Sequence, residues 1–214
     1  MKKPNLLFLL LLIVPALFLS WYFIAAKEDK PIRSLPHYGP KGDTSGVRHV
    51  VPSFRFTDQD GKVFTEKNLD GKIYVTEFFF TTCQSICPVM NRNLGRLYEQ
   101  FRDEPRLHFL SHTVDPETDS AHVLKQYAGD HGVNDSRWTF VTGEKSDLYA
   151  MARRGYLLDN SKADPHDDFV HTQKFALVDS RRHLRGFYDG TDSLEIIRLK
   201  QDIHQLLQEN ESAD

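Results

Sequence analysis

An apolar segment in the middle of the chain constrains the fold more than any other feature. Residues 73–80 read Ile-Tyr-Val-Thr-Glu-Phe-Phe-Phe, a mostly apolar run without helical spacing. Such a run is typical of a central strand that is buried on both faces of a sheet. A strand of this kind needs further strands at its sides and helices over its faces, so the chain is predicted to form an α/β domain.

Short apolar runs and helical periodicities alternate along the rest of the chain. The pattern predicts two hairpins, at residues 54–64 and 169–188, further strands at 107–114 and 138–141, and helices at 88–101, 123–128, 148–152 and 194–206. Strands separated by helices, with a hairpin near the end, predict a mixed sheet flanked by helices.

The N-terminal residues carry a membrane signal. Lys2 and Lys3 precede an uncharged run over residues 6–26, and at about 1.5 Å per residue a helix of this length spans roughly the hydrocarbon core of a bilayer. A signal peptide, cut after Ala25 or Ala26, is the competing interpretation. Its apolar region is usually shorter, however, and this run ends in the interfacial aromatics of residues 21–23. No cysteine lies directly after the run, which argues against lipoprotein processing.

The positive charges also predict an orientation. Lys2 and Lys3 are expected to stay in the cytoplasm, so the chain is expected to be a single-pass protein of the inner membrane with its soluble domain in the periplasm or otherwise outside the cytoplasm. Prolines and glycines after the anchor favour an irregular linker. The predicted organisation is an anchor at 1–26, a linker at 27–47, a domain at 48–210 and a tail at 211–214. A net charge of -3 gives no indication of a nucleic-acid partner.

The only two cysteines, Cys83 and Cys87, lie where the buried strand ends and Pro88 is expected to begin a helix. Four residues apart on a helical turn, their Cβ atoms would lie about 5–6 Å from each other, close enough to share a metal ion. A helix N-terminus also favours the thiolate, which is both a soft metal ligand and a redox nucleophile. A structural disulfide and two unrelated buried cysteines are the alternatives, but a bridge over so short a loop constrains the unfolded chain little.

An imidazole near the two sulfurs would indicate a metal site rather than a purely redox site. His171 stands near the start of an apolar strand segment, where it could face the helix end that carries the cysteines, but spacing alone leaves its role undecided. His108 and His112 share one face of a strand and are interpreted as structural. The others are assigned to the linker, loops, turns and solvated helix faces: His37, His49, His122, His131, His166, His183 and His204.

Three segments, in this order along the chain, resemble those of one known family. Residues 79–88 read Phe-Phe-Thr-Thr-Cys-Gln-Ser-Ile-Cys-Pro, residues 113–119 read Thr-Val-Asp-Pro-Glu-Thr-Asp, and residues 169–172 read Phe-Val-His-Thr. They resemble the cysteine loop, the Asp-Pro strand end and the histidine hairpin of the Sco/SenC family, membrane-anchored copper-delivery proteins involved in the assembly of cytochrome c oxidase. The resemblance covers about residues 51–207 and implies a thioredoxin-like fold with an insertion.

The resemblance further implies one copper ion, as Cu(I) or Cu(II), held by Cys83, Cys87 and His171. Two thiolates and an imidazole suit the cuprous ion and tolerate the cupric ion, whereas zinc in a structural site usually takes a fourth ligand. Asp115 becomes a candidate for an electrostatic role or a weak fourth contact, and equally for a turn residue at the strand end. Gln84 and Val170 replace the proline and the acidic residue of many relatives, but neither change removes a ligand.

The implied function is a copper chaperone that takes its ion from a donor protein and delivers it to the copper centre of a respiratory oxidase subunit. The alternative is an enzyme, a thiol–disulfide oxidoreductase that reduces the cysteines of that subunit, since the same thiolates serve both purposes. A peroxidase-like thiol enzyme is a third hypothesis, but Cys83 would then need a nearby cation, and the segment offers none before Arg92. Copper binding requires His171, whereas thiol exchange does not.

Overall fold

The computed structural model describes residues 13–16, 18–21, 34–40, 42, 44, 46–158 and 172–211. The chain divides into two units, Met1–Arg33 and Ser34–Asp214. In the first unit, residues 13–16 and 18–21 are helical, and most of the predicted membrane anchor lies outside the described residues. Among the residues that are described, no helix combines the length and the apolar character that crossing a bilayer requires.

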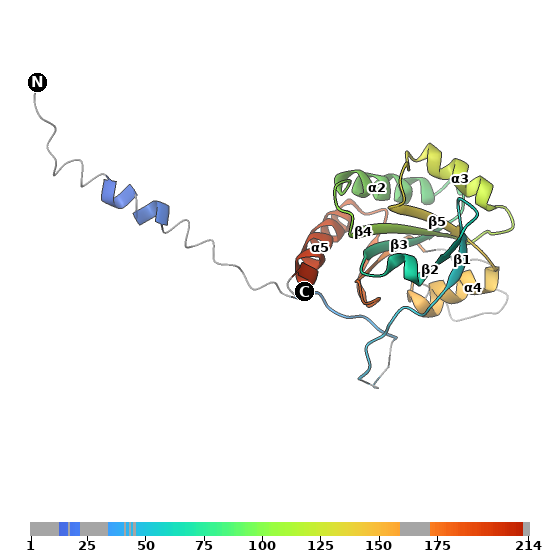
Figure 1. Ribbon diagram of the computed structural model, residues 1–214, viewed down its shortest axis with the longest axis horizontal. Helices are drawn as coiled ribbons and strands as arrows, with labels where there is room; N and C mark the ends of the chain where they lie inside the picture. Colours follow the sequence, from blue (N-terminus) through green and yellow to red (C-terminus); the bar gives the residue numbers. More distant parts are fainter. Residues whose placement is uncertain are drawn as a thin grey trace, which may run out of the picture. The chain divides into compact units, whose positions relative to one another are not determined.

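Within the described part of the larger unit, seven strands form one mixed sheet in the order β2-β1-β5-β4-β3-β6-β7 (Figure 1). β3, β4 and β5 are parallel to one another, and antiparallel hairpins, β1–β2 and β6–β7, close the two edges. The strands are β1 Arg55–Asp58, β2 Val63–Thr65, β3 Ile73–Phe79, β4 Leu107–Thr113, β5 Trp138–Thr142, β6 Lys174–Val178 and β7 Leu184–Asp189. The predicted α/β class with a mixed sheet is confirmed.

Helices cover both faces of this sheet. α2, α3 and α5 contribute to the hydrophobic cluster on one face, and α4 with the π-helical turn η2 contributes to the cluster on the other (Figure 1). The helices are η1 Glu66–Leu69, α2 Cys87–Gln100, α3 Ala121–Asp130, α4 Lys145–Ala150, η2 Met151–Gly155 and α5 Ser193–Glu211.

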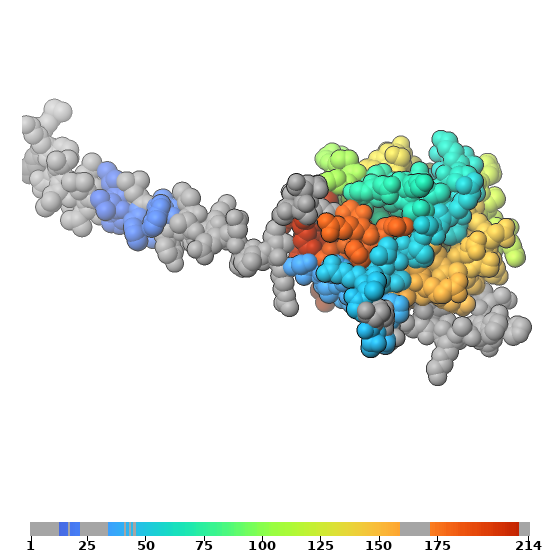
Figure 2. All heavy atoms as spheres, turned by 60° about the horizontal axis from the view of Figure 1, so that its bottom comes forward, coloured from blue at the N-terminus to red at the C-terminus, as the bar shows by residue number. Residues whose placement is uncertain are grey.

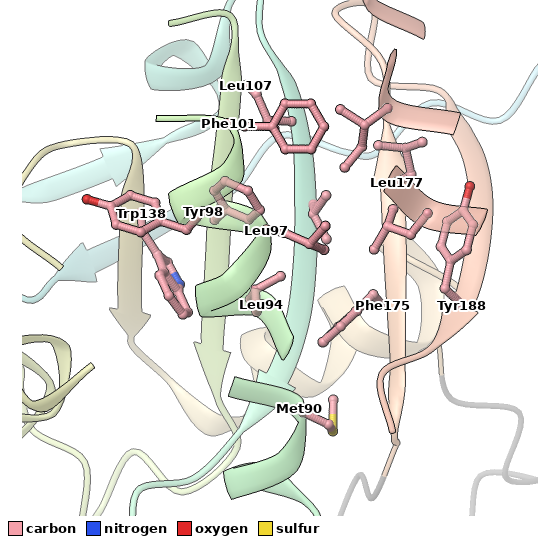
Figure 3. Close-up of a cluster of buried hydrophobic side chains, with 14 of the residues drawn as sticks. Met90, Leu94, Leu97, Tyr98, Phe101, Leu107, Trp138, Phe175, Leu177 and Tyr188 are labelled. Atoms are coloured by element: carbon pink, nitrogen blue, oxygen red, sulfur yellow. The ribbon is translucent and has the colours of Figure 1, made fainter. Parts of the chain in front are cut away.

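The first of these clusters fixes α2 against the sheet (Figure 3). Met90, Leu94 and Leu97 recur at helical spacing along one face of α2 and are almost completely buried. They lie beside Phe175 and Leu177 of β6 in the same cluster (Figure 3). Because this packing holds the whole helix, the first residue of α2, Cys87, is held in place relative to the end of β3.

Two predicted elements differ in detail from the observed ones. Within the described residues β6 begins at Lys174, and residues 169–171 of the predicted strand lie outside them. The predicted helix at 148–152 is the short α4 followed by the π-helical η2, in which the N–H of Tyr156 bonds the carbonyl of Met151 at 2.8 Å. A Cβ atom at Gly155 would lie 2.3 Å from the Met151 sulfur, so a larger residue there would require the Met151 side chain to move.

The two histidines of β4 are structural, as predicted. His112 Nδ1 lies 3.1 Å from Thr76 Oγ1 and His108 Nε2 lies 3.0 Å from Thr139 Oγ1, and both side chains are buried. The second ring nitrogen of each has no hydrogen-bond partner within the described structure. Burial lowers the pKa of each histidine to about 3, so the folded protein keeps both rings neutral.

These histidines are expected to make the free energy of unfolding fall as the pH is lowered. In the unfolded chain they take up protons near their usual pKa of 6.5, while in the folded protein they stay neutral down to about 3. Their contribution is therefore complete above pH 6.5 and is lost at up to about 1.4 kcal/mol per pH unit for each ring as the pH falls. Urea unfolding between pH 7 and 4.5 should show a flatter profile for His108→Gln/His112→Gln than for the parent or the exposed control His122→Gln. Equal slopes in all three proteins would refute this explanation.

Candidate metal centre

The two cysteines meet in the loop between β3 and α2. Cys83 lies in this loop, where its N–H donates to the carbonyl of Phe80 at 3.2 Å, and Cys87 is the first residue of α2. Both side chains are buried, at 8% and 4% exposure, and neither is in a disulfide. The Cys87 thiol lies close enough to the Cys83 sulfur to lower the pKa of Cys83. The two sulfurs are therefore adjacent, although the expectation that both lie on one helical turn is wrong, because only Cys87 is helical.

The same contacts separate the acidities of the two thiols. Burial raises the pKa of Cys83, but hydrogen bonds from Cys87 and Ser85 outweigh burial and lower it to about 7. Burial raises the pKa of Cys87 to about 12, helped by its interaction with Cys83 and by the negative charge of the Cys83 thiolate. Above about pH 7 the pair therefore holds mainly one proton, with Cys83 as the thiolate. The predicted preference for thiolate at the helix start fails for Cys87, the cysteine that begins α2, and hydrogen bonds in the loop lower the pKa of Cys83 instead.

A buried acid beside Cys87 is a feature that the sequence interpretation missed. Glu77 of β3 is fully buried and accepts a hydrogen bond from Ser111 Oγ at 2.8 Å. Ser111 Oγ in turn accepts from Trp138 Nε1 at 3.0 Å. The second carboxylate oxygen of Glu77 has no partner in the described structure, and burial raises the pKa of Glu77 to about 8. The sequence signal for this buried acid was that Glu77 is the only acidic residue in the apolar run 73–80.

Asp115 lies in the turn between β4 and α3 and is half-buried. Its carbonyl accepts the N–H groups of Thr118 and Asp119 at 3.2 and 2.9 Å, as expected of a turn residue. Its carboxylate makes no hydrogen bond or ion pair within the part of the chain that the structure describes. The accessory role of Asp115 at the metal stays a prediction.

Asp119, four residues further on, is the acid that ties the cysteine loop to the sheet. Its buried carboxylate accepts from the N–H of Thr81 at 3.1 Å and from the hydroxyl of Thr113 at 2.5 Å, and the hydroxyl of Thr81 also donates to it. Thr81 opens the loop that carries Cys83, and Thr113 ends β4. Asp119 is the last residue of the segment 113–119, but nothing in the sequence indicated these contacts.

Removing this carboxylate is expected to loosen the cysteine loop. Asp119→Ala leaves buried donors on Thr81 and Thr113 unsatisfied, which should lower the free energy of unfolding by about 2 kcal/mol. Because the loop then positions Cys83 less well, copper affinity should fall by about tenfold. Urea unfolding and a copper(I) competition titration measure the two effects, with the exposed Asp130→Ala as control. Parent-like values for Asp119→Ala in both assays would show that Asp119 does not hold the loop.

His171 lies outside the described residues, but the strand that follows it is well defined. β6 runs antiparallel to β3 with Thr76 opposite Ala176, so the start of β6 at Lys174 lies at the end of β3 that leads into the cysteine loop. The structure thus brings Cys83 and Cys87 together and leaves the position of His171 as a prediction.

A dithiol at the end of a central strand, on a mixed sheet covered by helices, defines a thioredoxin-like thiol domain. The model of the SCO1/SenC family matches residues 42–208, and the chain belongs to this family. The resemblance found in the three sequence segments is thereby confirmed.

Solved structures with the same fold include three informative ones. A SCO1/SenC family lipoprotein from Bacillus anthracis is 29% identical, with a TM-score of 0.66 over 74% of this chain and 95% of that one. BsSco, described as a Sco-family cytochrome c oxidase assembly protein with a disulfide switch, is 27% identical, with a TM-score of 0.64 over 74% and 93%. Yeast Sco1 with copper bound is 25% identical, with a TM-score of 0.56 over 72% and 88%.

Proposed function

We propose that this protein is a copper chaperone that binds one copper ion through Cys83, Cys87 and His171 and passes it to the copper centre of a respiratory oxidase subunit. The observation that carries the proposal is the adjacency of two free sulfurs, one of them already a thiolate near neutral pH. The register of β6, which places Lys174 at the end of β3 that leads into the cysteine loop, supports His171 as the third ligand. Copper bound to yeast Sco1 supports the choice of metal.

The chemistry of the three ligands suits transfer of the ion. Soft thiolates and one imidazole bind Cu(I) well, and Cys87 has to lose its proton as its sulfur joins the ion. Three ligands leave a side of the ion open to a ligand of the acceptor, so copper can move by stepwise ligand exchange from a donor protein to this chain and onward.

Thiol–disulfide exchange is the second candidate function, and the unequal acidities of the two thiols favour it. The Cys83 thiolate would attack one sulfur of a target disulfide and release the other as a thiolate, which takes a proton from solvent. Cys87 would then lose its proton and attack the mixed disulfide, leaving a Cys83–Cys87 disulfide and a reduced target. The disulfide switch described for BsSco supports this alternative.

Residues 6–26 are proposed to anchor the chain in the inner membrane, with the domain from about residue 48 on the outer side. The uncharged run after Lys2 and Lys3 carries this proposal, and a relative from Bacillus anthracis is described as a lipoprotein. Protease added to intact spheroplasts should digest the domain. A domain that stays protected until the membrane is broken would contradict the orientation.

A copper(I) competition titration of the reduced protein tests the leading proposal. The parent should bind one ion, and Cys83→Ser, Cys87→Ser and His171→Ala should each weaken binding by about tenfold or more, because each removes a ligand. His122→Ala, at an exposed helix position, is the matched control. His171→Ala should leave Cys83–Cys87 oxidation nearly intact. Parent-like binding by His171→Ala would sink the three-ligand site, and no binding together with ready reduction of a disulfide would favour the oxidoreductase.

A further inference from the structure

Away from the thiols, two histidines and an aspartate converge where residues 34–40, here called the lead segment, meet the β6–β7 hairpin. The ligand atoms of His37, Asp179 and His183 all lie within 4.8 Å of one another. His183 Nδ1 lies 3.3 Å from Asp179 Oδ2, and the rings of His37 and His183 are 5.2 Å apart. In Figure 2 the lead segment, in light blue, lies against the orange hairpin, and the N–H of Tyr38 bonds the carbonyl of Leu184 at 2.9 Å.

The carboxylate of this cluster is held rigidly. Asp179 Oδ1 accepts the N–H groups of Arg181 and His183 at 2.9 and 2.8 Å, and Oδ2 accepts Arg185 Nη1 at 3.0 Å. Arg185 is only 5% exposed and is itself fixed by Glu209. Carboxylates that bind metal ions are commonly held by hydrogen bonds of this kind, which fix their orientation before an ion binds.

The arrangement fits an ion with short bonds to nitrogen and oxygen. His183 Nδ1 and Asp179 Oδ2 lie 3.3 Å apart. If an ion lay about 2.1 Å from each atom, the N–ion–O angle would be about 105°, close to the tetrahedral angle. His37 is exposed, so a change of its side-chain rotamer can bring its ring to the third position. A water molecule would complete the shell.

The charges of the buried groups also permit a cation. Asp179 and Glu209 carry two negative charges and Arg185 carries one positive charge, which leaves one negative charge beside the two imidazoles. The exposed Arg48 near His37 opposes a cation, but solvent screens its charge.

We propose that His37, Asp179 and His183 form a second metal site, for a divalent ion of the zinc and copper(II) type. Two imidazoles and one carboxylate are ligands that these ions prefer, whereas magnesium and calcium favour all-oxygen shells. The ion would link the lead segment to the turn between β6 and β7 and so fix the path by which the chain enters the domain.

This site is separate from the cysteine pair. Asp179 directly follows β6, whose last residue, Val178, lies opposite Tyr74 near the start of β3, whereas Cys83 follows the far end of β3. Seven extended residues of β3 span roughly 20 Å, too far for one ion to contact both groups. The proposal of the second site therefore does not depend on the proposed copper transfer at the cysteine pair.

Titration of Zn²⁺ into the full chain carrying Cys83→Ser and Cys87→Ser tests the proposal without interference from the thiols. One Zn²⁺ should bind, and adding His37→Gln or His183→Gln should weaken binding by about tenfold each, as expected for loss of one ligand. The matched control His122→Gln should leave the affinity unchanged. Absence of Zn²⁺ binding, or binding that is insensitive to both His37→Gln and His183→Gln, would overturn the site.

Hydrogen exchange provides a second readout that does not depend on substitutions. Bound Zn²⁺ should slow exchange of the Tyr38 amide, because the ion ties the lead segment to the hairpin that accepts this hydrogen bond. Unchanged exchange at Tyr38 under saturating Zn²⁺ would contradict the proposed link.

Discussion

At pH 7.5, iodoacetamide is expected to alkylate Cys83 about a hundredfold faster than Cys87. With pKa values of about 7 and about 12, most Cys83 is thiolate at this pH, whereas only about one Cys87 in ten thousand or fewer is. The greater intrinsic nucleophilicity of the more basic sulfur offsets part of this difference, since reactivity rises with pKa with a Brønsted slope of about 0.5. About two powers of ten remain in favour of Cys83.

Peptide mapping by mass spectrometry over the course of the reaction measures both rates. The rate at Cys83 should rise with pH and reach half its maximum near pH 7. Ser85→Ala removes one donor to the Cys83 sulfur and should move this midpoint upward, whereas the exposed Ser120→Ala should not. Faster modification of Cys87, or equal rates, would show that the proton is not shared as the structure indicates.

Arg185→Met is expected to lower the free energy of unfolding by about 3–5 kcal/mol. The Arg185 guanidinium bonds Asp179 at 3.0 Å and Glu209 at 2.7 Å, and all three side chains are largely buried. It also donates to the carbonyl of Leu35 at 2.8 Å, which ties the lead segment to β7. Methionine fills a similar volume but leaves two carboxylates without their cation.

Urea unfolding near pH 7 measures this effect, with the exposed Arg181→Met as the matched control. Adding Glu209→Gln to Arg185→Met should restore part of the lost stability, because it removes one of the uncompensated charges. A loss below about 1 kcal/mol for Arg185→Met would mean that the buried ion pairs add little to stability.

The backbone of the thiol site was predictable because its signals are local. The apolar run at 73–80 predicts β3, and the recurrence of Met90, Leu94 and Leu97 predicts the helix behind it. The position of Cys83 was not, because the sequence does not reveal whether the turn before Pro88 is helical. The loop, rather than a helical turn, brings the sulfurs together, and that depends on long-range contacts such as Asp119 with Thr81.

The polar contacts between distant segments of the domain were likewise not predictable from the sequence. Glu77 and Ser111 belong to different strands, and only the parallel register of β3 and β4 makes them neighbours. His37 and His183 were assigned to the linker and to a turn. They are far apart in the sequence, yet the fold brings their rings side by side. Pairings of this kind depend on tertiary topology, which periodicity in one segment cannot supply.

X-ray absorption at the copper edge of the Cu(I)-loaded full chain tests the central claim most directly, because it identifies the atoms bound to the ion. In the parent the ion should have two sulfur neighbours and one nitrogen neighbour, with the nitrogen lost in His171→Ala and one sulfur lost in Cys83→Ser. A shell without sulfur, or a nitrogen neighbour that persists in His171→Ala, would contradict the site formed by Cys83, Cys87 and His171.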